Sequence, residues 1–539
     1  MDALRLIRTA RHLRPVQIWG RLAEPLPRPA PRSTGSPLRR PTAGAWAPPI
    51  ARDDPFQGPD RLRFLNEDAD VSGASAWRDR SRSHLWLYNL HYFDALTSAT
   101  DAEGRGRRAR LLARWIAENP IGDGPGWEPY PVSLRIVNWI KWSLAGAPFG
   151  HDWLASLAAQ ARWLERRIEW RLLGNHLIAN AKALIFVGLY FEGPEAERWR
   201  LHGLRLLGGQ LDEQLLADGG HFERSPMYHA IILEDLLDLI NLAGAMGQGG
   251  REVADWIAAS RAMRRWLRVM SHPDGEIGFF NDAAFGIAAP LAALEAYAAR
   301  LGLPPVSDNL APLEALTASG YVRIAAGDAA ALLDVAPVGP DCQPGHAHAD
   351  TLSFEFSLGA ERLIVNGGVS AYGADARRQQ ERATRSHSTV EVAGGNSSEV
   401  WAGFRVGRRA RPFDLRMGEA DDLAVSCAHD GYRHLRGSPV HRRGWRMTPN
   451  SLAITDGIEG GRACAVARHH LGPGVKAEAG ADWRSGRIVT PGGRSITWRA
   501  SEPVTIQASE WRPRFGERMA TQQLVFPVGR RPLNVVLSW

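Results

Sequence analysis

The sequence predicts an α+β protein of several domains, with a helical part first and an antiparallel β-sandwich after it. Between about residues 84 and 300, apolar residues recur every three to four positions, as on the buried face of packed helices. After about residue 318 they alternate with polar residues in short runs that end at Gly or Asp, which is typical of strands joined by turns. The length of 539 residues leaves room for both parts.

The composition indicates a globular chain that does not span a membrane. Hydrophobic residues make up 44% and charged residues 23%, and no apolar run approaches the roughly 18 residues that cross a bilayer. The three cysteines, Cys342, Cys427 and Cys464, are too scattered for a disulfide framework or a CxxC zinc site. The net charge of +7 favours an acidic partner. No nucleic-acid-reading motif is present, so we expect no nucleic-acid partner.

The chain begins with a predicted helix followed by a Pro-rich strap. Arg5, Arg8, Arg11 and Arg14 interrupt the stretch in which a secretory signal needs a continuous apolar run, so we expect a cytoplasmic location and leave export open. Proline is frequent from 21 to 60, where the chain should lie extended over a domain surface.

The helical part is predicted to be a series of helices separated by Gly, Pro and Asp. In one of them, 151–170, Trp153, Leu157 and Leu164 share one face. Similar patterns cover 106–118, 132–146, 176–191, 198–216, 229–246, 251–270 and 290–301. Helices in series predict hairpins arranged as a bundle, a solenoid or a toroid.

The β part is predicted from short apolar runs between turns. Leu352, Phe354, Phe356 and Leu358 alternate with polar residues, which predicts a half-buried strand over 351–358. Further predicted strands are 321–325, 330–335, 362–368, 388–395, 451–457, 494–500, 523–529 and 534–539.

One polar cluster precedes the predicted strand at 351–358. His346, His348 and Asp350 share one face if this segment is extended. They could be hydrogen-bonded groups at a strand end. With His387 on a neighbouring strand, they could also form a metal site or supply a general base.

Other polar clusters lie where helices are predicted to begin. Their side chains either cap those helices or line one shared mouth. A Pro- and Gly-rich loop carries aromatic residues that suit either sugar stacking or anchoring of the loop. The residues concerned are Asn175 and His176, then His221, Glu223, Arg224, Tyr228 and His229, and on the loop Trp127, Glu128 and Tyr130.

Six segments, in this order, resemble the heparinase II/III-like polysaccharide lyases. They are WLYNLHYFDAL (86–96), GNH (174–176), ERSPMYH (223–229), GHAHADTLSFEF (345–356), LIVNGG (363–368) and RSHSTV (385–390). The resemblance implies an incomplete (α/α) toroid joined to an antiparallel β-sandwich, with a cleft that binds uronic-acid polysaccharides. The expected divisions are a helix and strap at 1–60, a toroid catalytic domain at 61–315 and a sandwich at 316–539.

The resemblance also implies a β-elimination reaction that needs no cofactor for catalysis. Asn175 would neutralise the uronate carboxylate, while Tyr228, His176 and His346 would act as acid and base. Tyr228 is expected to protonate O4, with His346 or His176 in the other role. The expected substrate is an anionic polysaccharide, a glycosaminoglycan or an exopolysaccharide. Its contacts would come from Trp127, Tyr130, Arg224, His229 and Arg385.

Some members of that family bind a structural Zn²⁺ in the sandwich. The resemblance maps its ligands to His348, Asn366 and His387, but Asn366 stands where the family has Asp. A neutral amide is a poor zinc ligand, so the metal could be absent, weaker, or completed by water.

Two other functions stay open from the sequence. A toroid glycoside hydrolase would use two carboxylates, for which Asp218, Glu223 and Asp282 are available. A non-catalytic polysaccharide-binding or assembly protein would keep only the fold. The arginines that outnumber acids over 371–412 suit gripping of carboxylates or sulfates, or a solvated basic loop.

Overall fold

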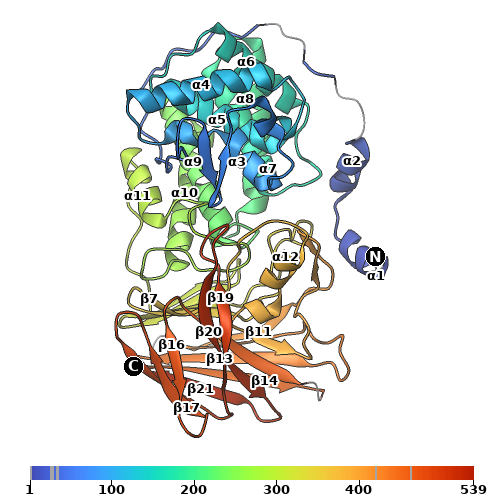
Figure 1. Cartoon of the computed structure of the whole chain (residues 1–539), viewed down its shortest axis with the longest axis vertical. Helices are drawn as coiled ribbons and strands as arrows, with labels where there is room; N and C mark the ends of the chain where they lie inside the picture. The colour runs from blue at the N-terminus through green and yellow to red at the C-terminus, as the bar shows by residue number, and fades with distance from the viewer. Residues whose placement is uncertain (1–2, 25–28, 32–34, 419–421, 462–463) are drawn as a thin grey trace.

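A computed structural model describes residues 3–24, 29–31, 35–418, 422–461 and 464–539 (Figure 1). Figure 1 shows the helices gathered in one half of the molecule and the strands stacked in the other, with helices α1 and α2 beside them. No helix of the described residues is long and apolar enough to cross a membrane.

The helices match the predicted series within a few residues at each end. Their bounds are α1 (Ala3–Ala10), α2 (Pro15–Ala23), α3 (His84–Tyr92), α4 (Ala102–Glu118), α5 (Pro129–Leu144), α6 (His151–Glu165), α7 (Asn175–Tyr190), α8 (Pro194–Gln214), α9 (Pro226–Ala245), α10 (Arg251–Val269), α11 (Leu291–Arg300) and α12 (Ala376–Glu381). Short 3₁₀ helices are η1 (Ala74–Arg78), η2 (Asp94–Thr97), η3 (Pro125–Trp127) and η4 (Thr384–Ser386).

Helix α7 is central to the helical half. Every residue of α7 except His176 is buried, because α5, α8 and α9 surround it. Helices α8 and α10 instead bury one face only, with Trp199 and Trp266 pointing inward. This difference follows from the sequence, since most residues of α7 are apolar and α8 and α10 are amphipathic.

Most of the strands follow α11. Their bounds are β1 (Arg61–Phe64), β2 (Glu67–Asp70), β3 (Leu313–Leu316), β4 (Tyr321–Ala326), β5 (Ala329–Asp334), β6 (Phe354–Leu358), β7 (Glu361–Val365), β8 (Val390–Val392), β9 (Val400–Trp401), β10 (Arg405–Val406), β11 (Pro412–Met417), β12 (Ala424–His429), β13 (Val440–Thr448), β14 (Ser451–Glu459), β15 (Ala465–Leu471), β16 (Lys476–Ala479), β17 (Ser485–Val489), β18 (Ser495–Ala500), β19 (Thr505–Trp511), β20 (Met519–Val528) and β21 (Leu533–Ser538). Only the β1–β2 hairpin precedes α11 among the described residues.

Two antiparallel sheets form the sandwich. Within the described residues, one has eight strands in the order β11-β12-β13-β14-β21-β18-β17-β16. The other has nine, in the order β19-β20-β15-β7-β6-β5-β4-β3 with β8 paired to β15. Apolar side chains from both sheets, Phe356 and Trp498 among them, share one core.

The prediction of a half-buried strand over 351–358 is wrong in two respects. Strand β6 begins only at Phe354, because Leu352 takes a left-handed backbone conformation with φ of 61°. The polar face of β6 is also buried, since the Glu355 carboxylate accepts hydrogen bonds from the His272 ring (2.8 Å) and from the backbone N–H of Phe279 (3.0 Å). Polar groups of the helical half therefore take the place of water at the polar face of β6.

The two halves share a continuous apolar core. Trp511 of β19 stacks on Phe279 with ring centroids 5.6 Å apart and packs edge-on against Phe285 at 5.9 Å. Helix α11 ends at Arg300 and β3 begins at Leu313, while the division at 315 and 316 stays a prediction.

Candidate active site

The start of α7 places an amide beside a buried carboxylate. Asn175 is the first residue of α7, and its Nδ2 lies 3.3 and 3.2 Å from the two oxygens of Glu223. Gly174 precedes it with φ of 59°, and a Cβ there would lie 2.3 Å from Glu223 Oε1. Only glycine allows this approach, so the conformation of Gly174 sets the Asn175–Glu223 contact.

The first turn of α9 presents Tyr228. Ser225 caps this helix by accepting a hydrogen bond from the Tyr228 N–H at 3.2 Å, and Pro226 suits the first helical position. The Tyr228 ring stacks on His346 with centroids 3.8 Å apart, and its hydroxyl lies 3.0 Å from that of Tyr372. Burial, together with Tyr372 and Asp282, raises the pKa of the Tyr228 phenol well above its ordinary value.

Asp282 contacts the Nδ1 atom of His346. His346 Nδ1 lies 2.9 Å from Asp282 Oδ2, and its Nε2 is 3.9 Å from Glu223 Oε2. Asp282 is fully buried and also accepts hydrogen bonds from His348 and from both terminal nitrogens of Arg378. Burial alone would raise the pKa of Asp282, but Arg378 and the imidazoles outweigh it and hold that pKa well below its ordinary value.

Because Asp282 is ionised, it can only accept hydrogen bonds. His346 therefore donates its Nδ1–H to Asp282, and this contact fixes the ring so that Nε2 faces Glu223, 3.9 Å away.

His176 lies beside Asn175 at the start of α7, and its surroundings favour the charged imidazolium. Its Nδ1 lies 3.1 Å from Glu169 Oε1, and its ring is 4.6 Å from that of Tyr130. Burial lowers the pKa of His176, but the Glu169 carboxylate more than offsets this, so the net shift is upward. A cationic imidazole at this place suits an anionic ligand.

The residues mapped to a zinc site bond within the protein through some of their polar atoms only. The Nε2–H of His348 donates to Asp282 (2.8 Å), and the Nδ1–H of His387 donates to the carbonyl of Ala383. His348 Nδ1 and His387 Nε2 then face each other 3.0 Å apart as two acceptors. The amide of Asn366 bonds to Ser353 and Ser388. Among the described residues, no three His, Cys, Asp or Glu side chains are grouped as a metal site. Two imidazole nitrogens beside a neutral amide do not make the four-ligand set of a structural Zn²⁺ site.

The remaining predicted site residues lie apart from Tyr228 and His346. Trp127 is 3% exposed between Trp115 and Trp163, and His229 is buried against Trp266. These positions are those of core side chains.

Two predicted substrate-binding arginines also point elsewhere. The guanidinium of Arg224 donates to the carbonyls of Ser319 and Phe222. Arg385 is 58% exposed and lies 3.6 Å from Glu391. The structure therefore brings together Asn175, His176, Tyr228, His346 and Tyr130, whose catalytic and binding roles stay predictions.

The sequence analysis missed Tyr372 and the role of Arg378. Tyr372 lies in the loop after β7, and its only sequence signal was an aromatic residue beside a Gly-rich turn. Arg378 belongs to the arginine-rich segment 371–412, for which a solvated or anion-binding loop was expected. It is instead fully buried and forms an ion pair with Asp282. Of the carboxylates considered for a hydrolase, Asp218 instead binds Ser319, and Asp282 is wholly engaged.

Two family models together match most of the chain. The model for the Heparinase II/III N-terminus matches residues 109–299, and the model for Heparinase II/III-like, C-terminal matches residues 308–537. The chain belongs to the heparinase II/III-like family.

This heparinase II/III-like chain is similar to proteins with two kinds of name. FtsZ-localized protein C of Caulobacter vibrioides (strain NA1000 / CB15N) is 29% identical over 452 residues, which cover 78% of this chain and 74% of that protein. A heparin-sulfate lyase of Pedobacter heparinus is 25% identical over 358 residues, which cover 59% of this chain and 53% of the lyase. The chain thus spans about half of that lyase.

Solved structures confirm the predicted fold of an (α/α) toroid followed by a β-sandwich. A crystal structure of heparinase III superposes with a TM-score of 0.67 at 17% identity, over 88% of this chain and 79% of that chain. The heparan sulfate lyase HepC mutant from Pedobacter heparinus gives 0.60 at 17% identity, over 91% and 81%.

Proposed function

We propose that this protein is a polysaccharide lyase that cleaves a uronic-acid-containing anionic polysaccharide by β-elimination. The observation that carries the proposal is the stacked pair of Tyr228 and His346, in which Tyr372 binds the phenol and Asp282 orients the imidazole. A phenol that keeps its proton and an imidazole with a free lone pair supply an acid and a base side by side.

Removal of the C5 proton of a uronate first requires neutralisation of its carboxylate. An amide nitrogen has two N–H bonds, and one bond directed between the oxygens of Glu223 leaves the second for a ligand. The second N–H of Asn175 and the imidazolium of His176 would then bind the uronate carboxylate and stabilise the charge that develops there.

The proton transfers follow from the orientations of the two rings. His346 Nε2 takes the C5 proton, the electrons of that bond form the C4=C5 double bond, and the C4–O4 bond breaks. The departing O4 takes the proton of Tyr228, whose raised pKa keeps the phenol protonated until then. No cofactor takes part in this scheme.

The proposed substrate class agrees with the names of several relatives, which are called heparin-sulfate lyases. The net charge of +7 also suits an anionic polymer. The uronate carboxylate is the only substrate group that the scheme requires, so sulfation is not specified.

Ultraviolet absorbance tests the reaction class. Incubation with a panel of uronate polysaccharides should produce a 4,5-unsaturated uronate that absorbs in the near ultraviolet. New reducing ends without absorbance would indicate hydrolysis instead, and neither product with any polymer would contradict an enzymatic function. Polymers without uronate serve as negative controls.

A second candidate function is assembly at FtsZ, because one relative is named FtsZ-localized protein C. A fluorescent fusion co-imaged with FtsZ would test this, and the same fusion tests the predicted cytoplasmic location. If Tyr228→Phe abolishes β-elimination and leaves FtsZ-dependent localisation intact, the two functions are separate. A fusion that never follows FtsZ would exclude this candidate.

A further inference from the structure

Helices α1 and α2 contact the rest of the protein through their polar faces. In α1, Arg8 donates two hydrogen bonds to Glu399, at 2.8 and 2.7 Å, and Arg5 lies 3.3 Å from the same carboxylate. One turn further along, Thr9 Oγ1 accepts a hydrogen bond from the indole of Trp401 at 3.1 Å. The side of α1 that carries Arg5, Arg8 and Thr9 is therefore the docked side.

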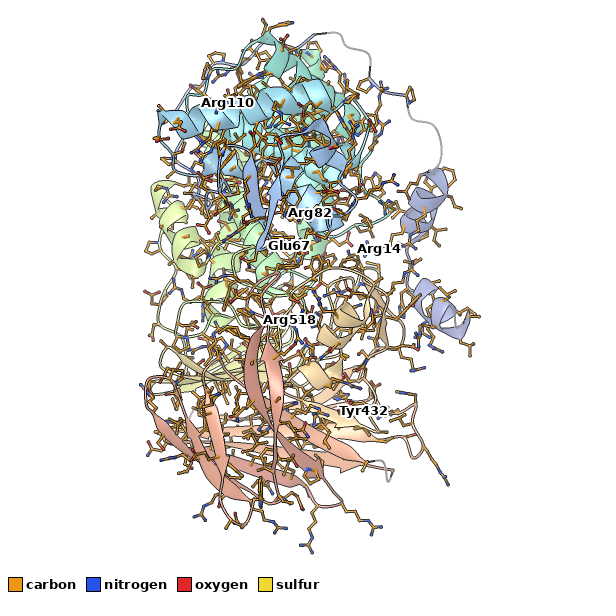
Figure 2. All side chains as sticks on the ribbon, viewed as in Figure 1. Arg14, Glu67, Arg82, Arg110, Tyr432 and Arg518 are labelled. Atoms are coloured by element: carbon orange, nitrogen blue, oxygen red, sulfur yellow. The ribbon has the colours of Figure 1, made fainter. Side chains whose placement is uncertain are left out.

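Helix α2 is docked in the same way. Arg14, immediately before it, lies 2.5 Å from Glu213 and projects between the helices and the body in Figure 2. Gln17 donates to the carbonyl of Cys342 at 3.0 Å. A Cβ at Gly20 would come within 3.0 Å of the backbone nitrogen of Arg171, so this helix approaches the body closely on that side.

The apolar faces of both helices point away from the body. Ile7 is 62% exposed in α1, and in α2 Ile18 is 47% exposed while Trp19 and Leu22 are each 68% exposed. No residue of α1 is buried, and Gln17 alone is buried in α2. Residues 18, 19 and 22 lie on one side of α2, opposite to Gln17 and Gly20, which face the rest of the protein.

This arrangement is the reverse of an ordinary amphipathic helix. A helix on a protein surface normally buries its apolar stripe and exposes its polar one. Burial of Leu and Ile side chains releases free energy, so a stripe held outward by ion pairs leaves that free energy available to a partner.

The charges around the stripe favour an anionic partner. Between Asp2 and Glu24 the sequence has five arginines and no acidic residue. The rest of the protein places further positive charge beside α2. After burial, Arg405 and Arg171 are the main causes of the lowered pKa of Arg21. The acidic groups beside these helices, Glu399, Glu213 and Glu24, are each paired with an arginine.

We propose that α1 and α2 form a docking surface for an anionic lipid bilayer, with Ile7, Ile18, Trp19 and Leu22 inserted at the membrane interface. Tryptophan and leucine on one face with arginine on the other is the composition of helices that lie in the membrane plane. The exposed side chains of Arg11 and Arg21 would contact lipid phosphates and headgroups. The toroid and sandwich would then be held at the membrane surface.

Vesicle co-sedimentation of the full chain tests the proposal. The wild-type protein should pellet with phosphatidylcholine vesicles that contain about 30% phosphatidylglycerol, and binding should weaken as salt rises from about 50 to about 300 mM. Trp19→Asp with Leu22→Asp should reduce the bound fraction by about tenfold or more. Trp483→Asp is the matched control, since Trp483 is 54% exposed in the sandwich.

The double variant should keep the wild-type melting temperature, because both side chains are exposed. Three results would overturn the proposal. These are absence of binding to anionic vesicles, equal binding by the double variant, and a wild-type dimer in solution that the double variant loses. The last result would assign the apolar stripe to a second copy of the chain.

Discussion

The ring of Tyr228 lies on the imidazole of His346, with centroids 3.8 Å apart and planes inclined by 29°. One ring comes from the start of α9 in the helical half and the other from the loop before β6. The pair therefore forms only when both halves are folded and in contact, and it links their packing to the proposed proton transfers.

Tyr228→Phe should reduce turnover by about 10² or more, the usual contribution of general acid-base catalysis. The ring packing stays and only the hydroxyl bonded to Tyr372 is lost. Turnover and melting temperature should be measured on one preparation. Tyr190→Phe is the control, because its hydroxyl bonds to Ser143 in the toroid core, and it should cost about 1 kcal/mol of stability without loss of turnover per folded molecule. A stable Tyr228→Phe protein with most of its activity would move the acid role to His176.

Arg378→Met should lower the free energy of unfolding by about 3–5 kcal/mol, because it leaves the buried carboxylate of Asp282 without its main cation. Urea denaturation measures the loss. Arg385→Met, at a 58% exposed position, should change stability by no more than about 0.5 kcal/mol. Equal effects of the two substitutions would show that the Asp282–Arg378 pair adds no stability.

Glu169→Gln should shift the pH dependence of substrate binding. Burial opposes the charge on His176, and the Glu169 carboxylate raises its pKa above 6.5. A raised pKa means that the cation is fully present below 6.5 and is lost as the pH rises through the raised value. Without Glu169 the pKa falls, so the pH at which KM increases should move down. Glu165→Gln, whose carboxylate binds Arg198 instead, should leave the profile unchanged. An unshifted Glu169→Gln profile would contradict a binding role for the His176 cation.

Prolonged chelation should leave the melting temperature unchanged, because two imidazole nitrogens of His348 and His387 beside the neutral amide of Asn366 lack the carboxylate that would complete a zinc site. Elemental analysis of the untreated protein should find less than one zinc per chain. Asn366→Asp restores a carboxylate ligand and should bind zinc measurably more tightly than the wild type. A stoichiometric zinc in the wild-type protein would show that Asn366 does not prevent binding.

The sequence predicted the helices well because their apolar period is long and repeated. The pattern over 251–270, for example, appears in the structure as α10, Arg251–Val269. The strand at 351–358 was misjudged because alternation of polar and apolar residues does not reveal whether the polar face meets water. Here the helical half supplies His272 and the N–H of Phe279 to Glu355, and no local pattern encodes that contact.

The candidate site was predictable only where residues lie in recognisable segments. Asn175, Tyr228 and His346 belong to such segments. Tyr372 and Asp282 reach the site through contacts between residues far apart in sequence, since Asp282 lies 96 positions from Arg378 and 64 from His346. Helix or strand periodicity carries no information about such pairings.

The shared core between toroid and sandwich limits how the two halves can move. A hinged opening between the halves would separate Trp511 from Phe279 and Phe285, and would expose their large aromatic faces to water. Exchange of a ligand at Tyr228 would therefore have to occur without a hinge between the two halves. Thermal unfolding of the toroid and the sandwich should then occur in one cooperative transition.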